Sequence, residues 1–246
     1  MKTHRTWTFL RLIAVLAVIV TVGKLARAQS CNVEWTGNAG DGQWSTAGNW
    51  NTHQVPGPLS EVCILTANGT SGSVDAIATP SISVHSIQVG QGVGLAFGSE
   101  TVSIATSLIS QGYLTMFGTT VSATSVDMQS GTLVGGGTIE GSLTNSGYLM
   151  PTNGETLRVT GDYTQTAGGE LSVNFATTYP PALVVKSNAT LSGALSVGVN
   201  LKRPPAKGST YTAMTFGSRN GEFTSFKIEG GGSVKYTNDS VVVTFQ

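Results

Sequence analysis

The chain has 246 residues, of which 39% are hydrophobic and 11% are charged, with 13 basic side chains against 13 acidic ones. The first 28 residues hold five of the basic residues and no acid, so the remainder carries a net charge of −5. Because nucleic-acid phosphates need clustered Lys and Arg, this acidic balance excludes DNA and RNA as expected partners.

Residues 1–28 have the features of a secretory signal peptide. A basic start, MKTHRTWTFLR, precedes an apolar run from Leu12 to Val22, and Ala26 and Ala28 occupy the small positions of an Ala-x-Ala cleavage site. The apolar run is shorter than the roughly 20 residues that cross a bilayer. We therefore expect cleavage after Ala28, a secreted or cell-surface protein, and no transmembrane segment in the mature chain.

Residues 29–70 are rich in tryptophan. The stretch EWTGNAGDGQWSTAGNW contains Trp35, Trp44 and Trp50 among mostly small polar residues. Large apolar side chains at this point suit a cap over the end of the repeats that follow. The alternative is a sugar-binding platform, because indole faces stack on sugar rings and are costly to expose otherwise. A mixed arrangement would bury Trp35 and Trp50 and expose Trp44.

Two cysteines, Cys31 and Cys63, bracket the tryptophan segment. An even count in an exported chain predicts one disulfide, which would stabilise the fold by roughly 3 to 4 kcal/mol. Two free, buried thiols are the alternative.

Residues 71–200 read as a repeat of short strands. Val, Ile, Leu and Thr alternate with small polar residues, and no helical periodicity is found. A phrase of Gly followed by an apolar residue recurs every 16 to 24 residues, and its anchors are Leu95, Leu114, Leu133, Leu149, Leu171 and Leu195. Such spacing predicts an all-β fold, a single-stranded parallel β-helix or β-solenoid of about five to six coils, with layers about 4.8 Å apart.

Residues 201–246 form the expected second cap. A β-solenoid leaves open strand edges at both ends, and these must be covered. The aromatic side chains available here are Phe216, Phe223, Phe226 and Tyr236.

These motifs resemble the small β-solenoid modules of secreted bacterial surface proteins, of the autotransporter-adhesin-passenger and β-strand-repeat type. The likeness lies in Trp35-Thr36-Gly37, Gly42-x-Trp44, Asn49-Trp50 and the later Pro56. It continues in GDYTQTAGGELSV (Gly161 to Val173), in ATLSGALSV and in Gly221-Glu222-Phe223. The resemblance implies a structural or adhesive role.

A carbohydrate-active enzyme on the same scaffold is the alternative function. A glycosidase needs two carboxylates, and counting back nine residues from the leucines puts Glu140 and Asp162 in one column, with Lys186 next. The competing interpretation is a solvated ladder of polar side chains. A polysaccharide lyase needs a basic residue, and residues 29–157 contain no Lys or Arg, which leaves Arg158 and Lys186.

The sequence therefore predicts a non-enzymatic, exported β-solenoid that binds a polysaccharide or an extracellular matrix. Its candidate ligand-binding residues are Trp35, Trp44 and Trp50. The catalytic candidates of the alternative are Glu140 and Asp162. We expect no metal ion and no cofactor.

Overall fold

The computed structural model describes residues 31–65, 73–75, 81–98, 101–152, 154–175, 180–199 and 204–246, so the expected signal peptide lies outside the described residues. Within these ranges the chain is all β, as the alternating sequence pattern predicts, and has no α-helix. One short 3-10 turn, η1 (Ala47–Asn49), interrupts the tryptophan segment.

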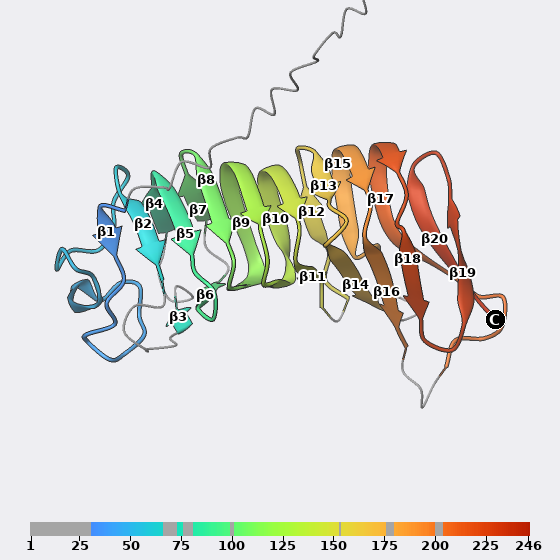
Figure 1. The fold of residues 1–246 in the computed structure, drawn as a ribbon, viewed down its shortest axis with the longest axis horizontal. Helices are drawn as coiled ribbons and strands as arrows, with labels where there is room; N and C mark the ends of the chain where they lie inside the picture. The colour runs from blue at the N-terminus through green and yellow to red at the C-terminus, as the bar shows by residue number, and fades with distance from the viewer. Residues whose placement is uncertain are drawn as a thin grey trace, which may run out of the picture.

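Twenty strands make up the described chain (Figure 1). The first eight are β1 (Val33–Glu34), β2 (Glu61–Ile64), β3 (Ser73–Asp75), β4 (Ser81–Val84), β5 (Ser86–Val89), β6 (Gly94–Phe97), β7 (Thr101–Ile104) and β8 (Ser107–Ser110). The next six are β9 (Tyr113–Met128), β10 (Thr132–Asn145), β11 (Tyr148–Met150), β12 (Leu157–Val159), β13 (Tyr163–Gln165) and β14 (Glu170–Asn174). The last six are β15 (Leu183–Leu191), β16 (Ala194–Gly198), β17 (Thr210–Gly221), β18 (Ser225–Ile228), β19 (Gly232–Tyr236) and β20 (Ser240–Phe245).

Strands pair in parallel with the strands of the next layer, and the layers follow one another along the long axis of the molecule (Figure 1). Three columns of paired inward residues run through the layers. The leucine ladder consists of Val74, Leu95, Leu114, Leu133, Leu149, Leu171, Leu195 and Phe226. The valine ladder consists of Ile82, Val102, Val121, Ile139, Val159, Val185 and Phe216. The mixed ladder consists of Val33, Val62, Ile87, Leu108, Val126, Leu143, Tyr163 and Ala189.

The six leucines expected to be equivalent do stack on one another, because all of them belong to the leucine ladder. Apart from Phe226, every member of the three ladders is buried in one contiguous hydrophobic core. Most residues on either side of these members point outward, which explains the alternation of apolar and small polar residues, whereas Cys63 and Ser86 are buried beside Val62 and Ile87.

Long strands connect neighbouring ladders by bending. Strand β10 contributes to all three ladders and β15 to two of them, and β10, β12, β15 and β13 form a closed circuit of parallel pairings. One bend of β10 lies at Gly141, whose φ is 150° and which approaches the carbonyl oxygen of Ala123 so closely that a Cβ would collide with it. Only glycine fits this position.

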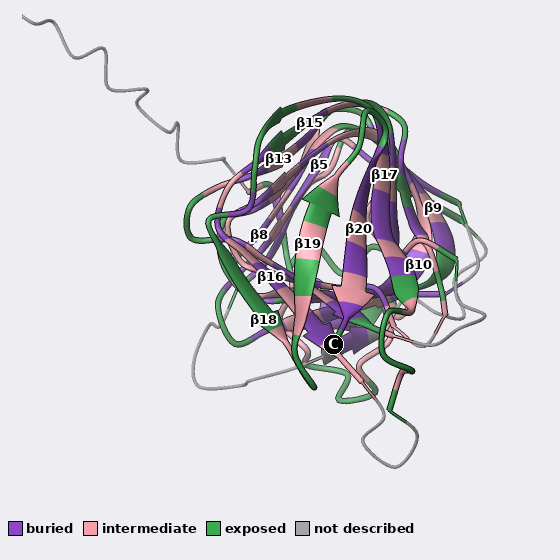
Figure 2. Cartoon of the chain, turned by 90° about the vertical axis from the view of Figure 1, so that its right-hand side faces the viewer, coloured by how far each residue is buried: buried purple, intermediate pink, exposed green. Residues whose placement is uncertain are grey.

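Antiparallel strands cover the C-terminal end. Strand β20 pairs antiparallel with β17 and with β19, and the two last strands lie across the end of the stack (Figure 2). Phe216 and Phe223 are buried there and Tyr236 is partly buried. Phe226 differs, since it remains 47% exposed.

Candidate functional site

The three tryptophans pack on one another at the N-terminal end. Trp50 lies in the middle, with the centroid of its ring 4.9 Å from that of Trp35 and 4.9 Å from that of Trp44, both in edge-to-face geometry. The indole nitrogen of Trp50 donates a hydrogen bond of 2.9 Å to the carbonyl oxygen of Trp44. Trp50 is fully buried and Trp44 is 1% exposed, while Trp35 is partly buried. The expected arrangement in which Trp44 is exposed is therefore wrong, and the rings of Trp44 and Trp50 both belong to the core.

A hydrogen-bonded loop holds the tryptophans inward. The buried side chain of Asn49 donates to Asp41 Oδ1 (2.6 Å) and to the carbonyl oxygen of Gln43 (3.0 Å), and accepts from the amide of Ala39 (3.0 Å). Asp41 also accepts from the hydroxyl of Thr46 (2.7 Å) and from the amide of Gln43 (3.0 Å). These donors, with Thr46 first, hold the pKa of Asp41 below its usual value.

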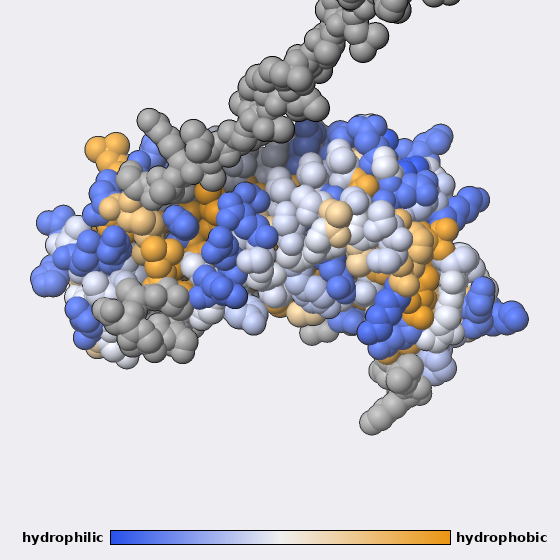
Figure 3. Space-filling view, viewed as in Figure 1, coloured by the Kyte–Doolittle hydropathy of each residue, from blue (hydrophilic) through white to orange (hydrophobic). Residues whose placement is uncertain are grey.

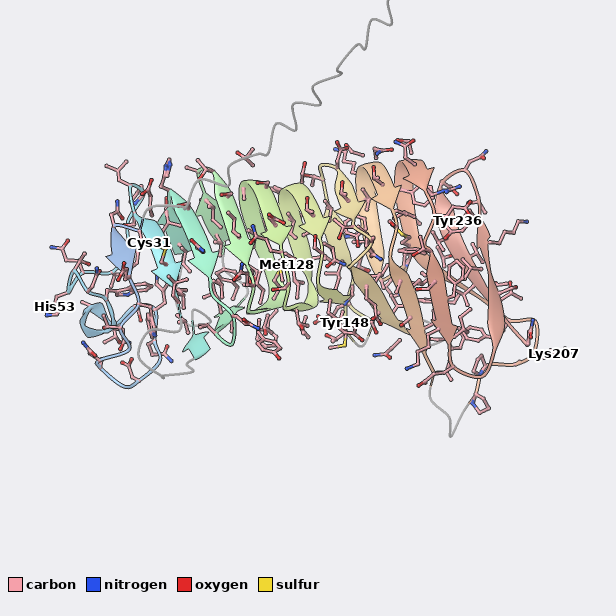
Figure 4. All side chains as sticks on the ribbon, in the orientation of Figure 1. Cys31, His53, Met128, Tyr148, Lys207 and Tyr236 are labelled. Atoms are coloured by element: carbon pink, nitrogen blue, oxygen red, sulfur yellow. A yellow bond between two sulfur atoms is a disulfide. The ribbon has the colours of Figure 1, made fainter. Side chains whose placement is uncertain are left out.

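Cys31 and Cys63 form the expected disulfide, with their Cα atoms 5.6 Å apart. Cys63 lies in β2, beside Glu34 of β1, so the bond ties the start of the described chain to the first layers. Figure 4 shows Cys31 at this end of the molecule. A disulfide indicates an oxidising compartment.

The expected alignment of Glu140 with Asp162 is wrong. Strand pairing places Glu140 opposite Ser122, and Asp162 directly precedes Tyr163, which stands opposite Leu143. Asp162 is therefore next to Ser142 in the preceding layer, two positions away from the column of Glu140. The cause is the turn after Tyr163, because Leu171 follows Tyr163 by eight positions, whereas Leu149 follows Leu143 by six.

The two carboxylates also bond in opposite directions along the stack. Glu140 Oε2 accepts a hydrogen bond from the hydroxyl of Ser122 in the layer before it. Asp162 Oδ1 accepts from the amide of Asn188 in the layer after it, at 3.2 Å. Lys186 follows Val185, which pairs with Val159, so it does belong to the column of Glu140, two layers away.

A groove of about 480 Å³, the serine groove, surrounds Glu140. Successive layers place Ser83, Ser103, Ser122 and Glu140 in one outward column. The other described residues that line it are Pro58, Val84, Ile104, Ala105, Ala123 and Thr124, so Glu140 is the single carboxylate among the described lining residues. The groove offers hydroxyl groups at the three successive layers before Glu140.

A second hollow of about 300 Å³, the tyrosine hollow, lies on the outward face of the leucine ladder. It is lined by Tyr148, Met150, Glu170, Ser172, Asn174, Ser196, Val197, Gly198, Val199, Lys227 and Glu229. Tyr148 lies near the middle of the long axis, away from both ends (Figure 4). We did not predict this hollow from the sequence, although Tyr113 and Tyr148 directly precede two of the repeated leucines and their outward direction follows from that position.

Arg158 and Lys186, the basic candidates of the lyase hypothesis, form no ion pair in the part of the chain that the structure describes. Arg158 and Lys186 are both exposed on outward positions of β12 and β15. In the described ranges, no three His, Cys, Asp or Glu side chains gather as metal ligands would. The expectation that no cofactor is bound stays a prediction.

Comparisons with known proteins find no relative of this chain, because no protein-family model, no curated protein and no solved structure matches it. Among the described residues, no helix has the length and apolar character of a membrane span.

Proposed function

We propose that the chain is an exported, non-enzymatic β-solenoid that serves as a structural or adhesive protein at or outside the cell surface, of the adhesin-passenger type that its sequence resembles. The observation that carries the proposal is the repetition of the same outward positions, layer after layer, along three ladders of parallel strands. A repetitive surface of this kind suits contact with an extended, repetitive partner.

The register supports the solenoid part of the proposal. From Val74 to Leu195 the leucine ladder advances in six steps of 16 to 24 residues, each the length of one coil with three strand positions. The tryptophan segment at one end and the β19–β20 hairpin at the other supply the caps that such a stack needs.

Two features support export. The disulfide needs an oxidising compartment, and residues 1–28 have the pattern of a cleavable signal peptide. Both favour a secreted or surface location.

The character of the surface supports adhesion. Figure 3 shows that over β10 to β12 the face toward the viewer is mostly weakly polar, while strongly hydrophilic residues gather toward the ends. In the serine groove, hydroxyl side chains recur at about 4.8 Å, the separation of paired strands. Hydroxyl groups that donate and accept suit polysaccharides and matrix components.

The serine groove also favours one second candidate, a carbohydrate-active enzyme with Glu140 in its site. Glycoside hydrolysis needs two carboxylates on either side of the scissile bond. The register separates Asp162 from Glu140, and for this reason we place the enzyme second.

Sedimentation with insoluble polysaccharides and matrix proteins, run beside a reducing-sugar assay on the same polysaccharides, tests the proposal. We expect the exported protein to sediment with at least one of these materials and to release no sugar, with Glu140→Gln and Asp162→Asn behaving as the wild type. Sugar release that is lost in Glu140→Gln would establish the enzyme instead. Absence of binding to every material would refute adhesion.

A further inference from the structure

We propose that the outward face of the leucine ladder binds an uncharged, extended β-1,4-linked glycan, with Tyr113 and Tyr148 as stacking platforms and the tyrosine hollow as the continuation of the site. The inference rests on the adhesive function proposed above and gives it a site and a ligand class.

The two tyrosines belong to one column of this face. Tyr113 pairs with Thr132, and Thr132 pairs with Tyr148, so both rings stand on the same side of the sheet, two layers apart. Their inward neighbours Leu114 and Leu149 are buried, which fixes the outward direction of the rings.

The exposure of Tyr113 needs an explanation. Tyr113 is 57% exposed and Tyr148 is partly exposed, whereas the three described tryptophans pack into or against the core. Outward aromatic side chains in one column of a sheet are typical of a binding surface. Their flat apolar rings match the flat faces of pyranose units.

The distance between the rings of Tyr113 and Tyr148 indicates which ligand geometry fits this face. Two layers separate the rings by about 10 Å along the stack, at about 4.8 Å per layer. In an extended β-1,4-linked chain, one sugar unit advances by nearly one layer, and alternate units present equivalent faces. Such a chain, lying along the axis of the molecule, can stack alternate units on Tyr113 and Tyr148, whereas an α-1,4-linked chain curls away from a straight row.

Polar groups continue the row beyond Tyr148. The next layer places Glu170 beside Tyr148, and the neighbouring column runs from Met150 through Ser172 and Ser196 to Lys227. The stack beyond Tyr148 thus offers a carboxylate, two hydroxyls and an ammonium group for sugar hydroxyls to bond.

The far wall of the hollow is shaped by a glycine and an anchored carboxylate. Glu229 Oε2 accepts from the amide of Val199 at 3.0 Å, which positions this acid. The side chain of Asn174 occupies the space that a Cβ at Gly198 would fill. The hydrogen bond fixes Glu229 at the rim of the hollow, and the absence of a Cβ at Gly198 leaves room there for the side chain of Asn174.

The charged residues of the tyrosine hollow favour uncharged over acidic glycans. Glu170 and Glu229 face the hollow with Lys227 as the single basic residue among its described lining. The carboxylates of Glu170 and Glu229 accept hydrogen bonds from sugar hydroxyls, but they repel the carboxylate of a uronate unit bound in the same hollow. A uronic-acid chain is therefore disfavoured.

Isothermal titration calorimetry with soluble oligosaccharides tests the site. We expect cellohexaose or chitohexaose to bind, with maltohexaose and a β-1,4-linked mannuronate hexamer at least about tenfold weaker. Affinity should rise steeply from cellobiose to cellotetraose, because only the longer chain reaches both tyrosines. Tyr113→Ala and Tyr148→Ala should each weaken cellohexaose binding by about tenfold or more and abolish this rise.

The control variants separate stacking from stability. Tyr148→Phe keeps the ring and should stay within about threefold of the wild type, and Leu59→Ala, at an 85% exposed apolar residue outside this face, should bind as the wild type does. The comparison of cellobiose with cellotetraose uses the wild-type protein alone, so it still tests the site if a substituted protein fails to fold.

Three results would overturn the inference: no binding of either uncharged hexamer, tighter binding of the mannuronate hexamer, or unchanged affinity in the Tyr113→Ala/Tyr148→Ala double variant. Sedimentation with polysaccharide or matrix that persists in this double variant would leave the adhesive function standing without this site. Loss of binding to every material by the wild type itself would remove both.

Discussion

At the residue scale, Asp41 organises the loop that carries the tryptophans, and its ionised form is the one that the loop stabilises. Its carboxylate accepts hydrogen bonds from Thr46, Gln43 and Asn49, and these bonds lower its pKa in the folded state. A carboxyl group whose folded pKa is depressed contributes stability above its unfolded pKa and loses that contribution as the pH falls through the folded pKa.

We therefore expect the midpoint of thermal unfolding to fall as the pH is lowered from about 5 to about 3. In Asp41→Asn the midpoint should be lower at pH 5 and should decline less toward pH 3. Scanning calorimetry at several pH values measures both quantities. The exposed Glu155→Gln should keep the wild-type pH profile, and an Asp41→Asn profile parallel to that of the wild type would contradict this role.

The same residues explain why the mixed arrangement, in which Trp44 is exposed, is wrong. Gln43 and Ser45 flank it and suggest an exposed position, but direction in an irregular loop depends on long-range hydrogen bonds. Asn49 joins Ala39, Asp41 and Gln43 and turns the segment inward. No local periodicity encodes such a loop.

At the scale of elements, the ladders were predictable and the register between them was not. The leucine anchors repeat in the sequence because each occupies the same inward position of its layer. The column of Glu140 was predicted by counting from these leucines, which assumes turns of equal length. The turn between Tyr163 and Leu171 is longer, so the assumption fails for Asp162. The turn that follows the strand of Lys186 has the usual length, so Lys186 was placed correctly in the column of Glu140.

Bends inside long strands give a prediction at this scale. Gly141→Ala introduces a Cβ against the carbonyl oxygen of Ala123 at a φ of 150°, so we expect the free energy of unfolding to fall by about 3 kcal/mol or more. Gly168→Ala is the matched control, since its Cβ meets no atom closer than 3.6 Å and its φ is not positive. Urea denaturation compares the two, and equal losses would show that the bend does not require glycine.

At the scale of the whole molecule, the N-terminal end is stabilised by the disulfide. The bond closes a loop with a sequence separation of 32 and encloses all three described tryptophans. Because Cys63 lies in β2, loss of this constraint acts first on β1, β2 and β5, which pairs with β2.

Reduction with dithiothreitol should lower the free energy of unfolding by about 3 kcal/mol. We expect the midpoint followed by tryptophan fluorescence to fall below the midpoint followed by far-ultraviolet circular dichroism, because the tryptophans report on the N-terminal end alone. The Cys31→Ser/Cys63→Ser variant should match the reduced protein and should not respond to reductant. Coincident midpoints after reduction would show that the stack unfolds as one unit.

The unequal turn after Tyr163 has a consequence for how this molecule can change over evolutionary time. Two extra residues are accommodated there without displacing a single column of the core, because Leu171 still stands opposite Leu149 and Tyr163 opposite Leu143. Insertions at such corners cost little chain entropy and leave the apolar contacts intact. New surface residues can therefore be inserted in the turns between strands, while the buried residues of the ladders keep the fold unchanged.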